Sequence, residues 1–281
     1  MPIDTSVLLD GLFFPEGPRW REGKLWFSDM HARQVMTVDL DGKAEKVVEV
    51  AGRPSGLGWL PDGRLLVVSM TDRRLLRLDP DGLKEVANLK ELASFHCNDM
   101  VVDLKGRAYI GNFGFDEAAK APFKPAEIVM VTPNGQACVA ADGLAFPNGT
   151  VITPDGNTLI VGETYAGRLT AFDITPDGSL VNRRVWAQLE GDFPDGICLD
   201  AEGAVWVASP VGTEVLRVRE GGEVTHRLKA SNKVYACMLG GPERRTLFAL
   251  TANSSNPQEV LARASGRIEV VEVAVPGDGL P

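Results

Sequence analysis

Apolar residues in this chain recur in short alternating runs separated by turn-forming residues. Between residues 55 and 89, the runs SGLGWL, RLLVVSM, RLLRLDP and KEVANL follow one another, with PDG between the first two. Alternation over four to eight residues, bounded by Gly, Pro and Asp, is typical of β-strands joined by tight turns. We therefore predict four consecutive strands here, at residues 55–60, 64–70, 74–80 and 84–89. Helical periodicity is nearly absent, and the prolines of the insertion at 116–127 favour a loop over a helical turn.

The same pattern of turn, apolar strand, Gly-containing turn and second strand repeats along the whole chain. The octets DGLFFPEG (10–17) and DGLAFPNG (142–149) show it most plainly, and they differ mainly where one carries Glu16 and the other Asn148. The equivalent positions are 39, 43, 50, 47 and 41 residues apart, and they are occupied by Glu16, Ser55, Asn98, Asn148, Asp195 and, approximately, Ala236. This period suits four short strands per unit and is typical of propeller blades. We predict an all-β protein in which residues 1–281 form a single six-bladed β-propeller domain.

The two ends of the chain complement each other. The octets show that a strand leads into the repeated turn, so residues 6–10 should form the fourth strand of a blade whose other strands lie elsewhere. The last unit offers three strands, CMLGG, TLFALTA and GRIEVVEVAV, but no fourth. We predict that the N-terminal strand completes the sixth blade by pairing near residues 267–274, which removes an open sheet edge.

The repeated turns bring oxygen-bearing side chains to one place. The first strand of each blade lines the central channel of a propeller, so the turns that enter these strands lie at one mouth. Two carboxylates and two carboxamides, from Glu16, Asp195, Asn98 and Asn148, would converge there as an oxygen-only set that suits hard cations such as Ca²⁺, Mg²⁺ or Mn²⁺. Asn, Asp and Ser are also ordinary turn residues, but Glu is a poor turn former. A shared cation site is therefore the favoured interpretation.

The order of PEGP, ND, FPNG and PDG resembles that of the regucalcin, gluconolactonase and luciferin-regenerating enzyme family, and the resemblance covers nearly the whole chain. It implies a six-bladed propeller with one divalent cation held by Glu16, Asn98, Asn148 and Asp195. Ca²⁺ is the favoured ion, with Zn²⁺, Mn²⁺, Mg²⁺ and Fe²⁺ as alternatives. The resemblance also implies lactone hydrolysis, with either Asp195 or a hydroxide generated by the cation as the base. Two rivals stay open: a phosphotriesterase-like hydrolase, similar to the diisopropyl fluorophosphatases, and a propeller that binds a cation or small ligand without turnover.

Side chains near the same mouth are candidates for binding the substrate. Sugar-lactone members of the family often carry Arg two positions before the first Asn, where this chain has His96, and the family's substrate-binding Glu has only Asp116 or Glu117 as candidates. The full set of predicted substrate-binding residues is His31, Met70, His96, Phe113 and Tyr165. Each could instead pack beneath the rim. Together they predict apolar walls with few polar anchors, and hence a lactone less polar than an aldonolactone.

Composition narrows the class of partner. The 281 residues are 44% hydrophobic and 24% charged, as in a soluble globular protein, and the formal net charge of −9 argues against a nucleic-acid partner. No apolar run approaches the roughly 20 residues that cross a bilayer, and the start MPIDTSVLLDG lacks the features of a signal peptide. We expect a cytoplasmic monomer or weak homo-oligomer that acts on a small molecule. The four cysteines lack a C-x-x-C pair and should be mostly buried thiols, with Cys97 a candidate reactive thiol because it adjoins Asn98.

Overall fold

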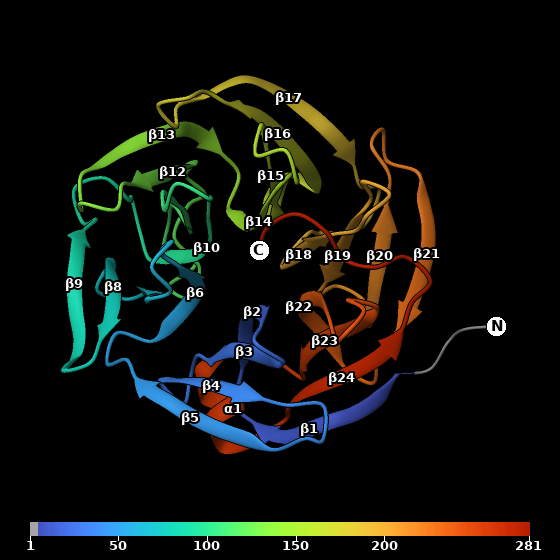
Figure 1. The fold of residues 1–281 in the computed structure, drawn as a ribbon. Coiled ribbons are helices and arrows are strands. Elements are labelled where there is room, and N and C mark those ends of the chain that lie inside the picture. The colour runs from blue at the N-terminus through green and yellow to red at the C-terminus, as the bar shows by residue number, and fades with distance from the viewer. Residues whose placement is uncertain (1–4) are drawn as a thin grey trace.

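The computed structural model describes residues 5–281, and within them six four-stranded antiparallel sheets surround a central channel (Figure 1). Blades 1 to 5 are formed by β2–β5, β6–β9, β10–β13, β14–β17 and β18–β21, and blade 6 by β22–β24 together with β1. The predicted six-bladed propeller is therefore confirmed. The first strand of each blade lies innermost, next to the channel.

The strands of blades 1 to 3 are β2 Pro15–Arg21, β3 Lys24–Asp29, β4 Gln34–Val38, β5 Ala44–Glu49, β6 Pro54–Trp59, β7 Leu65–Ser69, β8 Arg74–Asp79, β9 Gly82–Asn88, β10 Cys97–Val102, β11 Ala108–Asn112, β12 Ala126–Val131 and β13 Ala137–Leu144. Those of blades 4 to 6 are β14 Pro147–Ile152, β15 Thr158–Glu163, β16 Arg168–Ile174, β17 Leu180–Gln188, β18 Ile197–Leu199, β19 Val205–Ser209, β20 Glu214–Val218, β21 Val224–Lys229, β22 Lys233–Gly240, β23 Thr246–Ala252, β24 Gly266–Glu272 and β1 Ser6–Leu12. In blade 2, the four predicted strands match the observed ones to within two residues at each end. The predicted loop at 116–127 is confirmed up to the start of β12.

Between residues 5 and 281, two short helices lie outside the strand pattern, the 3₁₀ turn η1 (Thr164–Ala166) and the helix α1 (Pro257–Ala262). The sequence pattern missed α1, because six residues are too few to show a periodicity. Its start has a local signal, since the Asn256 side chain accepts a hydrogen bond from the Gln258 amide at 2.9 Å and Pro257 opens the first turn. In the part of the chain that the structure describes, no helix has the length and apolar character needed to span a membrane.

The N-terminal strand β1 closes the ring. It pairs antiparallel with β24, with Ser6 opposite Val270 and Leu12 opposite Gly266, which confirms the predicted closure. Glu269, 1% exposed on β24, accepts hydrogen bonds from the hydroxyls of Thr5, Ser231 and Thr251. This buried carboxylate ties the start of the chain to the sixth blade.

Glycines allow the innermost strands to approach one another around the channel. A Cβ atom on Gly17 would lie 2.6 Å from the Ser55 carbonyl oxygen, and one on Gly149 would lie 2.5 Å from that of Asp195, both closer than atoms can pack. These glycines directly follow the repeated oxygen-bearing residue of their blades. Blade 3 differs, because Asp99 stands at that position, and the corresponding turn of blade 6, VYACM, also has no glycine.

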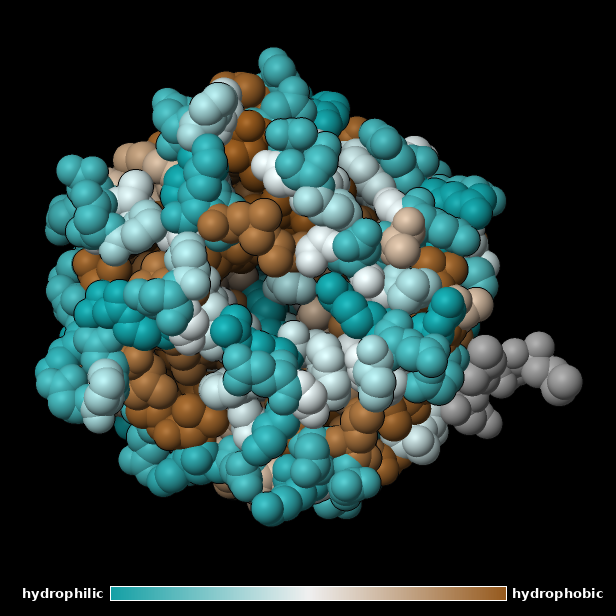
Figure 2. Space-filling view, in the orientation of Figure 1, coloured by the Kyte–Doolittle hydropathy of each residue, from teal (hydrophilic) through white to brown (hydrophobic). Residues whose placement is uncertain are grey.

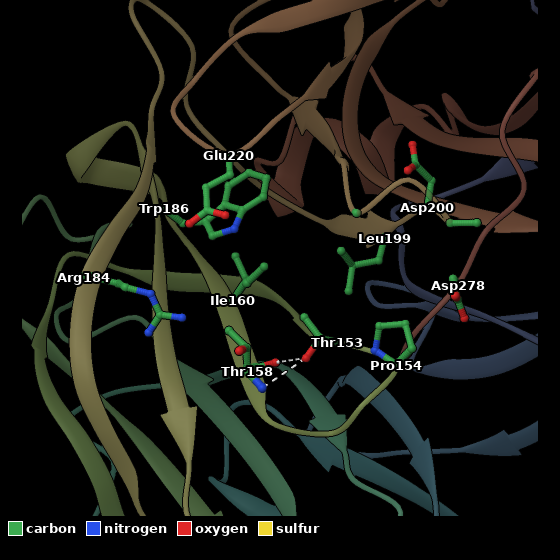
Figure 3. A pocket seen from close by; sticks show the side chains of 12 residues that line it. Thr153, Pro154, Thr158, Ile160, Arg184, Trp186, Leu199, Asp200, Glu220 and Asp278 are labelled. Carbon is green, nitrogen blue, oxygen red and sulfur yellow. Dashed lines mark hydrogen bonds between the residues drawn. The ribbon is translucent and has the colours of Figure 1, made fainter.

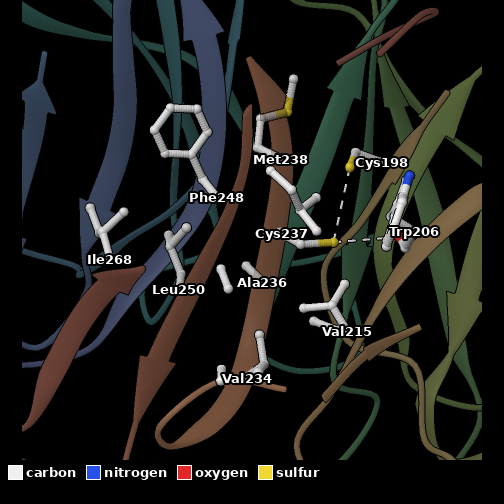
Figure 4. Packing of buried hydrophobic residues seen from close by; sticks show 14 of the residues in the cluster. Cys198, Trp206, Val215, Val234, Ala236, Cys237, Met238, Phe248, Leu250 and Ile268 are labelled. Carbon is white, nitrogen blue, oxygen red and sulfur yellow. Dashed lines mark hydrogen bonds between the residues drawn. The ribbon is translucent and has the colours of Figure 1, made fainter. Parts of the chain in front are cut away.

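Apolar side chains fill the space between neighbouring blades, as Figure 4 shows for Trp206, Met238 and Phe248 near blades 5 and 6. In the same cluster the sulfur atoms of Cys198 and Cys237, from adjacent innermost strands, lie 4.0 Å apart as free thiols. Three of the four cysteines are buried as predicted, and Cys138 is exposed. The expectation that Cys97 could be reactive is wrong, because burial raises the pKa of its thiol to about 12.

The C-terminal segment crosses the end of the channel opposite the repeated turns. Leu280 and Ile152 exchange two backbone hydrogen bonds of 2.8 and 2.9 Å, and Asp278 donates to the Leu199 carbonyl at 3.1 Å. The segment therefore lies against the ends of β14 and β18, and in Figure 1 the C-terminus lies over the centre of the ring. Figure 2, in the same orientation, shows a hollow with hydrophilic atoms at its floor beside this segment.

Candidate functional site

The four predicted cation ligands occupy equivalent positions at one end of the channel, which we call the mouth. Glu16, Asn98 and Asn148 are the second residues of β2, β10 and β14, and Asp195 lies two residues before β18. Asn98 and Asn148 are each 7% exposed and Asp195 is 9% exposed, whereas Glu16 is partly exposed. The repeat thus delivers one oxygen-bearing side chain from each of four blades to the same level. Ser55 holds the corresponding position in β6.

The two carboxylates of this set lie in each other's electrostatic field. Burial raises the pKa of Asp195 to about 8, the charges of Asp99 and Glu117 add to the shift, and the neighbouring Asn148 amide opposes it. Burial also raises the pKa of Glu16 well above its ordinary value, and the next largest cause is the charge of Asp195. Two carboxylates that resist ionisation side by side form a site where a cation would be stabilising.

The donor set fits a hard divalent cation. The Asn98 side chain has a buried Nδ2 atom with no hydrogen-bond partner within residues 5–281, so this amide is free to turn its oxygen toward a ligand. In the same range, no three His, Cys, Asp or Glu side chains gather as a metal cluster, so amide oxygens must complete any site here. Oxygen-only coordination of this kind suits Ca²⁺.

A buried ion pair lies beside the ligand set and joins three blades. Arg19 Nη2 donates to Asp99 Oδ1 at 2.7 Å, and Arg19 Nε donates to the Leu57 carbonyl at 2.9 Å. The same guanidinium also donates to the carbonyls of Pro18 and Met100. The sequence reasoning missed this pair. Its signal was the ND of blade 3, where the turns of blades 1, 2, 4 and 5 read EG, SG, NG and DG.

One wall of the mouth is formed by aromatic and sulfur-containing side chains of blades 1, 2 and 6. Phe14 lies 5.3 Å from the ring of His31 and 4.7 Å from that of Tyr235, measured between centroids. Met70, 3% exposed, packs into the same cluster and lies beneath the surface of the wall. Tyr235 is a further residue that the sequence did not single out. Burial raises the pKa of its hydroxyl to about 12, and the charge of Asp195 adds to the shift.

His31 is buried in this wall without a partner. It is 9% exposed, and neither ring nitrogen forms a hydrogen bond of acceptable geometry within the described residues, although the Ser255 main chain lies close enough to oppose the shift in its pKa. Burial lowers the pKa of His31 to about 4, and the charge of Arg53 lowers it further. The ring is therefore neutral at pH 7.

A second wall comes from blades 3 and 4. The ring of His96 stacks on Phe95 at 4.1 Å and lies 6.2 Å from that of Phe113, which in turn stacks on Phe146 at 4.6 Å. Burial lowers the pKa of His96, and the charge of Asp116 opposes this shift. His96 and Phe113 thus both lie at the mouth, as the sequence predicted.

The insertion between β11 and β12 bends over this second wall. Tyr165, 44% exposed, donates its hydroxyl to Glu117 Oε1 at 2.6 Å, and its ring lies 5.5 Å from that of Phe115. Because the charge of Glu117 also reaches Asp195, the insertion lies near the predicted cation ligands. Tyr165 is therefore a rim residue that anchors the insertion.

Two cavities lie at the other end of the channel, away from all the predicted site residues. One, of about 340 Å³, lies at the ends of blades 4 and 5, and Thr153 there accepts a hydrogen bond from the Thr158 amide (Figure 3). Its Asp200 is already paired with Arg217 at 2.7 Å. The second, of about 330 Å³, is bounded by Arg19 and by Leu280 of the C-terminal segment.

Comparison with known proteins finds one family model, several curated relatives and several solved structures that match this chain. The family model described as SMP-30/Gluconolactonase/LRE-like region matches residues 14–253. The chain is 24% identical to regucalcin of Gallus gallus over 274 residues, covering 93% of this chain and 92% of the relative. It is 25% identical to lactonase drp35 of Staphylococcus saprophyticus over 259 residues, covering 82% and 75%. Among solved structures, the calcium-binding protein regucalcin of Agrobacterium tumefaciens superimposes with a TM-score of 0.82 at 22% identity, covering 100% and 97% of the two chains.

Proposed function

Since this chain belongs to the SMP-30/gluconolactonase/LRE-like family, we propose that it is an enzyme that hydrolyses a lactone with the help of one divalent cation. The observation that carries the proposal is the arrival of Glu16, Asn98, Asn148 and Asp195 at equivalent positions of four blades. Relatives named as a lactonase and as a calcium-binding protein support the reaction and the ion. We propose Ca²⁺ as the native ion, with Zn²⁺, Mn²⁺, Mg²⁺ and Fe²⁺ as alternatives.

The carboxylates and amides would hold the cation, and the side chains of the mouth would bind the substrate and transfer the proton. When bound, the cation would polarise the lactone carbonyl and stabilise the negative charge that develops on its oxygen. Asp195 accepts a proton from the water that attacks the carbonyl carbon. As the ring C–O bond breaks, the proton passes to the leaving oxygen, and the product is a hydroxy acid. Phe113 and the Phe14 cluster limit the access of other water molecules.

The character of the walls selects the substrate within this reaction class. A substrate rich in hydroxyls needs matched buried donors and acceptors, since each unpaired polar group costs about 1 to 3 kcal/mol. His96 lies where sugar-lactone relatives carry Arg, and Phe113 beside it is apolar. We therefore propose a preference for lactones less polar than an aldonolactone. This preference is tested by comparing kcat/KM for gluconolactone, an alkyl γ-lactone and dihydrocoumarin at fixed cation concentration. A tenfold advantage for the sugar lactone would refute the preference but not the lactonase activity.

A panel of lactones, aryl esters and phosphotriesters, each assayed with and without added cation, tests the function itself. Cation-dependent opening of lactones above the other classes is the expected result. Faster turnover of phosphotriesters would assign the chain to the phosphotriesterase-like alternative. Cation binding without turnover of any class would indicate a binding protein.

A further inference from the structure

Arg53 is a positively charged residue at the mouth that the proposed reaction does not use. It lies in the connection between β5 and β6, directly before the first residue of an innermost strand, with a backbone φ of 63°. Its carbonyl accepts a hydrogen bond of 2.9 Å from the amide of Met70 in the aromatic wall. These contacts fix its backbone at the level of the predicted site, one blade away from Glu16.

The Arg53 side chain is half-buried and has no partner. Within residues 5–281, its guanidinium forms neither an ion pair nor a hydrogen bond, whereas buried Arg19 forms both. Burial lowers the pKa of Arg53, and the charge of the nearby Arg33 adds to this shift. An arginine that has lost part of its hydration without gaining a carboxylate is costly unless a ligand supplies one.

Two imidazoles lie close to Arg53, one from each neighbouring blade. Met70, whose amide donates to the Arg53 carbonyl, accepts a hydrogen bond of 3.1 Å at its own carbonyl from the amide of Cys97, the residue after His96. Met70 also packs in the cluster of Phe14, whose ring lies 5.3 Å from that of His31, and the charge of Arg53 acts on both imidazoles. His31 is nine-tenths buried and its two ring nitrogens lack partners among the described residues. Arg53, His31 and His96 thus bring N–H donors together at the mouth, with Arg33 and Arg73 among the charges close to them.

The guanidinium is separate from the predicted cation ligands. Arg53 precedes β6, whose repeated position is Ser55 and not one of the four predicted ligands. Arg53 is therefore placed to bind a part of the substrate other than the reacting carbonyl.

We propose that Arg53, assisted by His31 and His96, binds a carboxylate group carried by the lactone substrate, so that the natural substrate is an anionic lactone with an apolar body. The inference rests on the proposed function and adds the substrate class to it. A planar guanidinium pairs with a carboxylate through two parallel hydrogen bonds, which orient the ring as well as bind it. The aromatic walls then contact the remainder of the ring, and the carbonyl is presented to the ligand set.

A matched pair of lactones tests the proposal. Wild type, Arg53→Met, Arg53→Lys and Arg33→Met are assayed with γ-butyrolactone γ-carboxylate and with its neutral γ-hydroxymethyl counterpart. The ratio of kcat/KM for the anionic over the neutral lactone should fall about 10- to 100-fold in Arg53→Met, because a charge-assisted pair is lost. Arg53→Lys should recover part of the ratio. Arg33→Met removes an exposed neighbouring charge from a residue with a similar φ of 60° and should leave the ratio unchanged. Melting curves of all variants confirm that they fold.

Calorimetric binding of tetrahydrofuran-2-carboxylate, which has no bond to hydrolyse, separates this proposal from the proposed function. Its binding should weaken in Arg53→Met and persist in Glu16→Gln, because the carboxylate is held by Arg53 and not by the cation. If lactones are opened but the ratio is the same in wild type and Arg53→Met, the carboxylate site is overturned and the lactonase stands. If no lactone is opened but binding depends on Arg53, the lactonase fails and the carboxylate site stands. Absence of both activities overturns both.

Discussion

The guanidinium of Arg19 lies 2.7 Å from the carboxylate of Asp99, and both side chains are almost entirely buried, at 5% and 10% exposure. Each belongs to an innermost strand that also carries a predicted cation ligand, Glu16 in β2 and Asn98 in β10. The pair therefore fixes the two ligands relative to each other through the backbones that bear them.

Breaking this pair should be strongly destabilising. In Arg19→Met the Asp99 charge stays buried without a partner, and the free energy of unfolding should fall by about 3 to 5 kcal/mol. Urea unfolding followed by circular dichroism measures the change. Arg184→Met is the control, because the Arg184–Asp173 pair is 42% exposed on both sides and should cost about 1 kcal/mol or less. Equal losses in the two variants would show that the buried pair has no special role.

Glu16→Gln should impair cation binding while the fold survives, because it removes one of two ligand charges and little volume. Ca²⁺ at about 100 times its Kd should stabilise wild type by about 2.7 kcal/mol, and the variant should lose most of this at the same concentration. Thermal unfolding with and without Ca²⁺ gives the comparison, with the exposed Glu45→Gln as control. A wild type that shows no bound metal by elemental analysis after dialysis against Ca²⁺, Mn²⁺ and Zn²⁺ would refute the cation site.

Asp195→Asn should lower turnover more than Asn148→Asp. The first removes a ligand charge and the proposed base together, whereas the second keeps the base and adds a charge. Loss of a general base typically costs about 10²- to 10⁴-fold in rate. Single-turnover rates under saturating cation separate this effect from weakened cation binding. Small and equal losses in both variants would reject Asp195 as the base and favour hydroxide generated by the cation.

Protonation of His31 should lower the free energy of unfolding in acid. Its pKa is lowered to about 4 from an ordinary value of 6.5, so the unfolded chain takes up a proton at a higher pH than the folded chain does. The stabilisation is complete above pH 6.5 and is lost as the pH falls toward 4, by up to roughly 3 kcal/mol. His31→Phe should flatten this part of the pH profile of unfolding free energy. His226→Phe, which changes an exposed histidine, should not, and identical profiles for wild type and His31→Phe would contradict the assignment.

Removing residues 1–11 should expose the edge of β24. The truncation deletes most of β1, so the β24 groups that pair with it would be left free to pair with another molecule. Light scattering should show aggregation, and the melting temperature should fall. The control truncation removes residues 1–4 and keeps β1. An unchanged melting temperature and monomer yield after the longer deletion would contradict the role of β1 as the closing strand.

The fold could be predicted from the repeat, because each strand and the turn that ends it are neighbours in the sequence. The same locality located Glu16 and Asn148 at one level, since the octets that carry them align without gaps. Arg19 and Asp99 are 80 residues apart, and the sequence around either residue does not indicate that the other is its partner. The missing glycine at Asp99 marked an exception, which the turn of blade 6 shares, and its meaning depends on how closely the strands approach.

Side chains on the connections were harder to place than those on the strands. Tyr165 was expected to bind substrate, but its hydroxyl is bonded to Glu117 of the insertion, a contact set by how a loop folds back. The sequence pattern did not indicate Arg53, because this residue lies two positions before the repeated position of its blade and belongs to no motif. Its interest arises from the absence of a partner among the described residues, which is a property of three-dimensional packing and not of local sequence.

The C-terminal segment joins the ends of two innermost strands. Leu280 is held against Ile152 of blade 4 by two backbone hydrogen bonds, and Asp278 is held against Leu199 of blade 5 by one. The last residues therefore act as a strap across two blades at the face remote from the predicted ligands. A change in the length of this strap would alter how blades 4 and 5 are held together without touching a residue of the ligand set.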